Sequence, residues 1–161
     1  MIPTLLLVAL PASGKSELRR YLASLSPEAV AADFGLGPTV QLDDYPYVHL
    51  MRRISEEMRE LRVAPAFFSS TEQPFLDPRD WGTLMHLLNE DFAALVAGDH
   101  PEPAAAAAAP WLIDRMDRAR HLVGLPPVLA GIDSATQLAV QELIEPDARR
   151  LWADLNDNLT K

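Results

Sequence analysis

Hydrophobic residues near the N-terminus form one uninterrupted run, followed by a turn and a helical pattern. Thr4 to Leu10 is apolar at nearly every position, as expected for a strand buried on both faces of a parallel sheet. Pro11 to Gly14 break this run. Ser16 to Leu25 then predicts an amphipathic helix, and Thr39 to Leu42 predicts a second short strand. The first forty or so residues therefore predict a strand, a loop, a helix and a strand.

The middle of the chain has helical spacing. Between Val48 and Leu61, apolar residues recur every three or four positions, with arginines and glutamates between them. Asp77 to Asp80 is typical of a helix start, with Asp77 as N-cap and a proline at the first helical position. The apolar face that follows predicts a helix that stops at Gly98.

The last third also predicts helices, over Trp111 to Val123 and over Ser134 to Leu159, the second interrupted near Pro146. Val128 to Ile132 is the only later run with the composition of a buried strand. Three tryptophans on apolar helix faces are assigned to the core: Trp81, Trp111 and Trp152.

These patterns predict three regions. Residues 1–100 are predicted to form a nucleotide-binding region. Residues 111–161 are predicted to form a helical segment that belongs to the same domain or follows it. Residues 101–110 lie between them and contain six consecutive alanines flanked by prolines, which is typical of a linker or of an easily extended helix start.

Composition narrows the class of protein. The chain has 161 residues, 48% of them hydrophobic, and no cysteine, so one domain can bury a core without disulfides or Cys-ligated zinc. A net charge of -9 argues against a nucleic-acid partner, because such proteins neutralise phosphates with Lys and Arg. The N-terminal apolar run is too short to cross a bilayer and lacks the features of a secretory signal. We expect a cytoplasmic protein without a membrane partner.

Charge is distributed unevenly along the chain. Residues 1–62 carry seven basic and eight acidic groups, whereas residues 63–161 carry seven and fifteen. An anionic ligand therefore meets least repulsion in the first third. Lys15 and Lys161 are the only lysines among fourteen basic residues, which indicates that Lys15 occupies a place where arginine does not fit.

The segment Ala9-Leu-Pro-Ala-Ser-Gly-Lys-Ser16 resembles a Walker A motif, with Ala9 in place of the usual first glycine. A tight loop between a strand and a helix turns backbone N–H groups towards one point, where the helix N-terminus adds partial positive charge. Lysine then reaches the β- and γ-phosphates, and the serine hydroxyl takes a place on Mg²⁺. The phosphate-binding residues predicted here are Pro11, Ala12, Ser13, Gly14, Lys15 and Ser16.

Two adjacent carboxylates, Asp43 and Asp44, follow the second predicted strand. A carboxylate beside a phosphate loop can take the proton of a phosphoryl acceptor or help to order Mg²⁺. We rank Asp43 first as the base and assign Asp44 to Mg²⁺ or to capping the next segment. The alternative interpretation is a turn that simply ends the strand.

Together these segments resemble the uridine kinase and phosphoribulokinase group of P-loop kinases. A third segment, Phe75 to Trp81 followed by a helix ending at Gly98, is similar in order and spacing, so the resemblance covers about residues 2–103. It implies an α/β fold with parallel strands, and transfer of the γ-phosphoryl group of ATP to a small-molecule hydroxyl. The resemblance also implies Mg²⁺, held by Ser16 and Asp44, with Lys15 and Asp43 as catalytic residues. The acceptor class stays open among nucleosides, sugars and coenzyme precursors.

The chain departs from that group after residue 103. An apolar strand ending in an acidic residue is expected next, but residues 104–161 are Ala-rich and helical. Either the chain is the N-terminal part of a longer kinase that continues past Lys161, or helices replace the missing strands. An open sheet edge predicts self-association, or a helix from the second half folded over that edge.

Two other functions stay open: an ATPase or nucleotide-dependent switch without an acceptor, and a helical interaction domain with a vestigial loop. Among further residues, His49 is the one histidine that we place near the active cleft. Arginines after the aspartate pair either hold an anionic acceptor or, as we prefer, pair with glutamates on a solvated helix face. They are Arg52, Arg53, Arg59 and Arg62.

Overall fold

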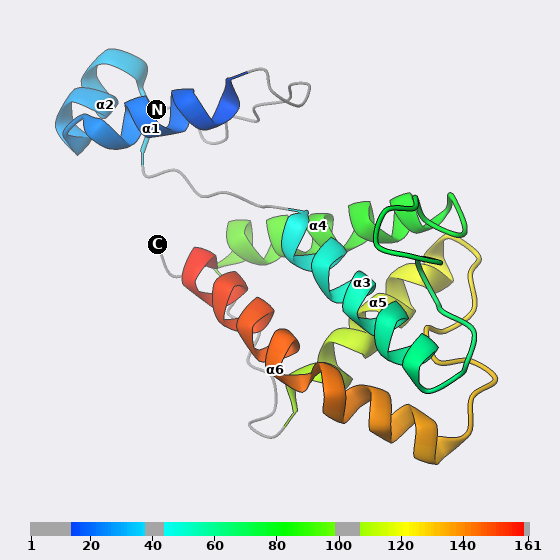
Figure 1. Cartoon of the computed structure of the whole chain (residues 1–161). Coiled ribbons are helices and arrows are strands. Elements are labelled where there is room, and N and C mark those ends of the chain that lie inside the picture. Colours follow the sequence, from blue (N-terminus) through cyan, green and yellow to red (C-terminus); the bar gives the residue numbers. More distant parts are fainter. Residues whose placement is uncertain (1–13, 38–43, 99–106, 160–161) are drawn as a thin grey trace. The chain divides into compact units, whose positions relative to one another are not determined.

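The structure is a computed structural model and describes residues 14–37, 44–98 and 107–159. The chain divides into two compact units, residues 1–40 and residues 41–161 (Figure 1). In the first unit, α1 (Lys15–Ser24) and α2 (Pro27–Phe34) are described. The second unit contains α3 (Tyr45–Glu60), α4 (Asp80–Ala97), α5 (Ala108–Leu122) and α6 (Ser134–Leu159).

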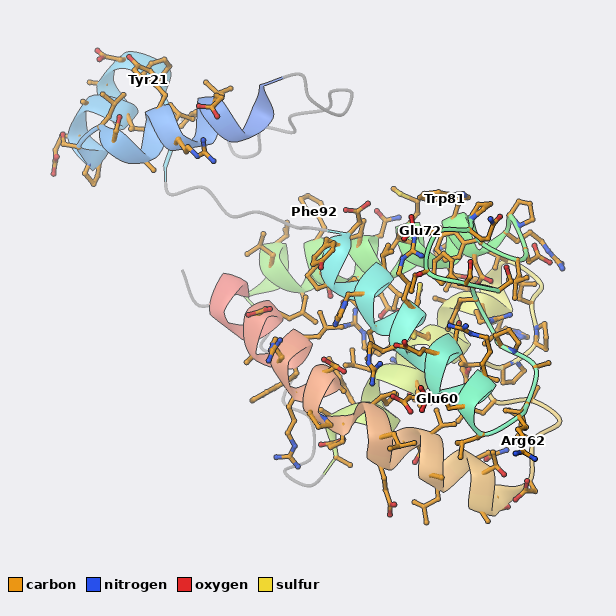
Figure 2. All side chains as sticks on the ribbon, in the orientation of Figure 1. Tyr21, Glu60, Arg62, Glu72, Trp81 and Phe92 are labelled. Carbon is orange, nitrogen blue, oxygen red and sulfur yellow. The ribbon has the colours of Figure 1, made fainter. Side chains whose placement is uncertain are left out.

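The helix pair of the first unit is short and well capped. Ser26 is the N-cap of α2 and accepts a hydrogen bond from the N–H of Ala29, while Gly35 ends the helix in a left-handed conformation. Leu22 of α1 and Val30 of α2 are buried, and the rings of Tyr21 and Phe34 meet edge to face, with Tyr21 half-exposed (Figure 2). This unit buries little apolar surface among its described residues.

The second unit is built around α5 and α6. α6 packs against α3 and α5, and α5 also packs against α4. The predicted apolar face of α3 is confirmed, because Met51, Ile54 and Met58 are all buried. The core that these helices share includes, from α5 and α6, the fully buried side chains of Leu112, Met116, Val140 and Ile144.

Helix ends follow the predicted chemistry in part. α4 stops where the sequence predicts, with Gly98 left-handed at φ 68°. Its start is two residues later than predicted, and the carboxylate of Asp77 forms a local turn in which it accepts from the N–H and the guanidinium of Arg79. The predicted interruption near Pro146 is not seen, because α6 runs through that residue and only changes direction near its middle (Figure 1). Proline removes one hydrogen bond of the ladder, which explains a bend within a continuous helix.

Residues 61–79 connect α3 and α4 as a long loop that hydrogen bonds anchor to the core. The hydroxyl of Ser55, which is fully buried in α3, accepts hydrogen bonds from the N–H groups of both Phe67 and Phe68 at 3.1 Å and donates to the carbonyl of Met51. Phe68 and Phe75 form an isolated bridge, with their rings stacked at 4.5 Å. Ser55 therefore fixes the loop against the helix that precedes it.

The predicted α/β fold with a parallel sheet is wrong for the part of the chain that the structure describes. That part contains six helices and no strand, and the isolated bridge of the 61–79 loop is its only β-type pairing. Residues 128–132, the later run with the composition of a buried strand, instead contain a turn, and the buried side chains of Val128 and Leu129 belong to the helical core. The two strands predicted in the N-terminal region, Thr4 to Leu10 and Thr39 to Leu42, lie outside the described residues.

Candidate functional site

The predicted phosphate loop meets the described structure at the start of α1. Gly14 is the N-cap, with a left-handed backbone at φ 88° and ψ 9°, and its carbonyl accepts from the N–H of Leu18 at 3.0 Å. Lys15 and Ser16 are the first two residues of the helix. The other predicted loop residues, Pro11, Ala12 and Ser13, lie outside the described residues. A glycine is needed here because L side chains rarely adopt this conformation.

The predicted carboxylate pair is described at one of its two positions. Asp44 is the N-cap of α3, with Pro46 in the first turn, whereas Asp43 lies outside the described residues. Lys15 belongs to the first unit and Asp44 to the second. Among the described residues, no three acidic or histidine side chains gather in a way that could hold a metal ion.

The arginines of α3 mainly form structural contacts. Arg53 pairs with Glu56 and Glu57 of its own helix and, through Nε at 3.2 Å, with Asp147 of α6. Arg52 lies over the ring of Phe68. This contact supports neither of the two predictions for Arg52, which were a site for an anionic acceptor and an ion pair with a glutamate. The prediction of ion pairing is therefore confirmed for Arg53.

The same face of α3 carries His49. Its Nε2 lies 3.5 Å from Asp147 of α6, and its ring stacks on Tyr45. His49 thus joins two helices of the second unit.

A buried ionic network that the sequence analysis missed links α3, α4 and α5. Arg115 donates to Tyr47 Oη at 2.9 Å, to Asp91 at 2.8 Å and to Glu90 at 3.0 Å, and Tyr47 donates to Asp91 at 2.7 Å. Burial raises the pKa of Tyr47, so the phenol stays neutral and serves as donor and acceptor at once. Every group in this network is engaged, which is typical of a structural role.

A second missed feature is a cavity of about 480 Å³ in the same unit. Its walls come from the end of α3, from residues 63–66 of the long loop, and from residues 126–133 between α5 and α6. Polar and apolar surface contribute about equally to these walls. Arg120 of α5 lines the cavity together with Asp133, whose carboxylate already caps α6 by accepting from Ala135 and Thr136.

Arg120 is buried without the hydrogen bonds that a buried guanidinium normally makes. The residue is 5% exposed, and neither Nε nor Nη1 has a hydrogen-bond partner. Its closest carboxylate is Asp80, at 3.7 Å from Nε, and the guanidinium lies 4.9 Å from the ring centre of Phe67. Burial lowers the pKa of Arg120, an effect that Asp80 and Asp117 offset only in part. A buried guanidinium without acceptors lowers the stability of the folded state, because its N–H groups lose their hydrogen bonds to water.

Comparisons of the chain with protein-family models, with curated proteins and with solved structures found no match. No helix in the described part of the chain is long and apolar enough to cross a membrane.

Proposed function

We propose that the chain binds ATP and Mg²⁺ through residues 9–16 and transfers the γ-phosphoryl group to a small-molecule hydroxyl. The observation that carries this proposal is the left-handed Gly14 at the N-terminus of α1, directly before Lys15 and Ser16 in a Walker A-like sequence. Left-handed glycines at helix starts aim backbone N–H groups outward, where a phosphate can accept them. A cytoplasmic location, where ATP is available, is part of the same proposal.

Each residue has a defined task in this proposal. Lys15 neutralises the β- and γ-phosphates, and the Ser16 hydroxyl and Asp44 carboxylate are hard oxygen donors of the kind that Mg²⁺ prefers. When bound, Mg²⁺ supplies charge that offsets the phosphates. Asp43 accepts the proton of the attacking hydroxyl. The proposal concerns the loop segment and does not depend on the sheet that the described residues lack.

The phosphate site is tested by Lys15→Ala in the full chain. Loss of one charge-assisted contact should weaken ATP–Mg²⁺ binding by about 1.5–3 kcal/mol, while unfolding in the absence of ATP stays unchanged. Titration calorimetry measures the affinity. Arg20→Ala is the matched control, because Arg20 is an exposed cation on the same helix that pairs only with Glu17 among the contacts described. Equal ATP affinity in wild type and Lys15→Ala would falsify the proposal.

The chemical step is tested by Asp43→Asn, which keeps size and polarity but removes the basic oxygen. Turnover with a hydroxyl acceptor should fall about 10²–10⁴-fold while ATP binding is retained. ADP release measured with and without nucleosides, sugars and pantothenate-like alcohols separates a kinase from an ATPase. Normal turnover in Asp43→Asn together with an inactive Asp44→Asn would reverse the two assignments, and normal turnover in both would leave the pair as a turn.

A second candidate function, a helical interaction domain, is favoured by an exposed apolar face of α4. The residues of this face recur at spacings of 4, 3, 4 and 4, and four of them are 40–67% exposed (Figure 2). The charges of α4 are Asp80, Glu90 and Asp91, and all three are engaged with arginines of α5. The face, which we term the α4 strip, consists of Trp81, Met85, Leu88, Phe92 and Val96.

The occupant that suits the α4 strip is a second copy of the chain. In an antiparallel pair related by a two-fold axis between Leu88 and Asn89, Trp81 lies opposite Val96 and Met85 opposite Phe92. A large ring then meets a smaller side chain, and a thioether meets an aromatic ring. The uncharged strip is also the part of an acidic molecule where two copies repel least. An 18-residue helix supplies a strip about 27 Å long, which favours a weak dimer.

Sedimentation velocity over a concentration series tests this candidate. Wild type should dimerise with a Kd in about the micromolar range, and Met85→Glu should be monomeric, because a charge would be buried in each strip. Leu138→Glu is the control, since Leu138 is equally exposed but lies on α6. A monomeric wild type at about 1 mM rules out the dimer.

A further inference from the structure

The exposed side chains of the α4 strip are spaced symmetrically along the helix. Its four most exposed members form two pairs that share one midpoint, which lies between Leu88 and Asn89. The pairs are Trp81 with Val96 and Met85 with Phe92. An interface between two copies related by a two-fold axis uses the same patch on each copy, so the patch must be complementary to itself. The spacing therefore favours an antiparallel pair of α4 helices, with the axis at the level of Leu88 and Asn89.

Asn89 is a polar residue beside this apolar strip. With about 100° between successive residues of a helix, Leu88 and Asn89 lie about 50° to either side of the mid-line of the four exposed side chains. Leu88 packs against the core, whereas Asn89 is exposed, and its side chain makes no hydrogen bond to another described residue. At the level of the axis, one edge of the strip thus carries a leucine and the other carries an amide.

An antiparallel pair brings the two Asn89 side chains together. The two-fold axis places them on the same edge of the interface and at the same height, within reach of each other at the usual interaxial distance of about 8–10 Å. A carboxamide contains both a donor and an acceptor, so Nδ2 of each Asn89 can donate to Oδ1 of the other. Leu88 meets Leu88 of the second copy on the opposite edge. Both polar and apolar groups are then matched.

A parallel pair leaves the same amides without partners. Its two-fold axis runs along the helices and places the two Asn89 side chains on opposite edges, where each faces Leu88 of the second copy. Each amide then loses contact with water and gains no hydrogen bond, which is unfavourable. A shift of one helical turn has the same effect in the antiparallel pair, because it places Asn89 beside Met85 or Phe92.

We propose that Asn89 selects the antiparallel orientation and the register of the α4 dimer through a reciprocal pair of amide hydrogen bonds. A single polar residue in an apolar helix interface can fix register and orientation at some cost in affinity. This inference rests on the dimer proposed above for the α4 strip, and it is independent of ATP binding at residues 9–16. Asn89 is thus a specificity determinant of the interface, and the apolar strip supplies the affinity.

Distances between spin labels distinguish the two orientations. The chain has no cysteine, so Ala97→Cys in the full chain places one label at an exposed position at the end of α4. The labelled positions should lie about 30 Å apart in the antiparallel dimer and about 15 Å apart in a parallel one. Double electron–electron resonance measures this distance at concentrations where sedimentation velocity shows the dimer. Met85→Glu is the monomeric control and should show no dipolar coupling.

Two substitutions at Asn89 separate the amide from its position. With Asn89 in place, we expect one distance of about 30 Å. Asn89→Leu should add the shorter distance, and its Kd should be equal to that of wild type or up to about tenfold lower, because an apolar side chain replaces the polar one. Asn89→Gln keeps the amide and should keep the single distance.

Other results would overturn separate parts of the proposal. A single distance of about 30 Å in Asn89→Leu overturns the role of Asn89 while the dimer stands. A dominant distance of about 15 Å with Asn89 in place overturns the antiparallel arrangement. Two distances in both Asn89→Leu and Asn89→Gln overturn the amide pair as the cause. A chain that stays monomeric overturns the dimer itself, and the role of Asn89 with it.

Discussion

Two arginines five residues apart on α5 are equally buried, with side chains 6% exposed, and yet they have opposite surroundings. Arg115 donates to two carboxylates and a phenol, whereas Arg120 has only a loose ion pair with Asp80 and lies beside a cavity. The pKa of Arg115 is raised, because Tyr47 and Asp91 outweigh the effect of burial, and the pKa of Arg120 is lowered by burial. One site is complete within the protein, whereas in the other Nε and Nη1 of Arg120 and Oδ2 of Asp80 have no hydrogen-bond partner.

The two arginines differ in how completely the protein satisfies their hydrogen-bonding groups. A satisfied network rigidifies the core, whereas a buried ion pair without hydrogen bonds contributes less to stability. The comparison therefore predicts different consequences for equivalent substitutions at the two positions.

Arg115→Met should have the largest effect on stability. The substitution leaves Asp91 buried and facing only Tyr47, and loss of one partner of a buried ion pair costs about 3–5 kcal/mol. Urea unfolding measures the change. Arg118→Met is the matched control, because Arg118 is an exposed arginine of the same helix whose pair with Asp114 contributes little.

Arg120→Met should cost less, about 1–3 kcal/mol, because the lost interaction is a single pair without a hydrogen bond. Part of that loss should be recovered by adding Asp80→Asn, since Thr83 can still donate to an amide oxygen. If Arg120→Met destabilises as much as Arg115→Met in the same urea series, the contrast between the two arginines is wrong.

Tyr47→Phe should lower the free energy of unfolding by about 1–2 kcal/mol and shows how strongly Tyr47 is coupled to the Arg115 network. It removes the donor to Asp91 Oδ2 and one acceptor of Arg115, while the buried ring remains. Thermal unfolding of wild type, Tyr47→Phe and Arg115→Met, together with the double variant, gives the coupling energy. Additive effects would contradict a connected network.

Glu145→Gln should have the smallest effect, about 1 kcal/mol, and a defined pH dependence. The carboxylate of Glu145, on α6, caps α5 by accepting from the N–H groups of Ala108 and Ala109 at 3.1 and 2.8 Å. Burial opposes ionisation, but these bonds and Arg149 hold the pKa of Glu145 below its ordinary value.

A carboxylate with a lowered pKa stabilises the folded state most at neutral pH. The difference between wild type and Glu145→Gln should therefore be full near pH 7 and shrink as pH falls below about 4.3, the ordinary glutamate value. Urea midpoints across that range measure it. A difference that stays constant down to about pH 3 would contradict the assignment.

Local signals in the sequence were sufficient for most helices and insufficient for the fold class. The periodic face of α3 and the stop at Gly98 were predicted because both depend on neighbouring residues. α2 was missed even though Ser26, Pro27 and Gly35 carry its cap chemistry. The parallel sheet was inferred from two apolar runs outside the described residues, and apolar runs alone do not distinguish strands from buried helices.

The candidate sites were less predictable, because they depend on contacts between distant segments. Trp81 was assigned to the core and is 57% exposed, since α4 has two apolar faces and periodicity does not say which one faces inward. Neither buried arginine could be recognised, because Asp80 and Asp91 lie a whole helix away in the chain. Only the Gly14-Lys15-Ser16 segment carries a signal that is readable locally.

The hydroxyl of Ser55 has a consequence for the dynamics of the loop after α3. The amides of Phe67 and Phe68 lie outside any helix, but both are bonded to an oxygen that is itself fully buried. Their exchange with deuterated solvent should therefore be as slow as that of amides inside α3, while amides of this loop that have no hydrogen-bond partner exchange quickly. Slow exchange at these two positions would mark the loop and α3 as one cooperative opening unit, in which one wall of the cavity is released only when the helix itself unfolds.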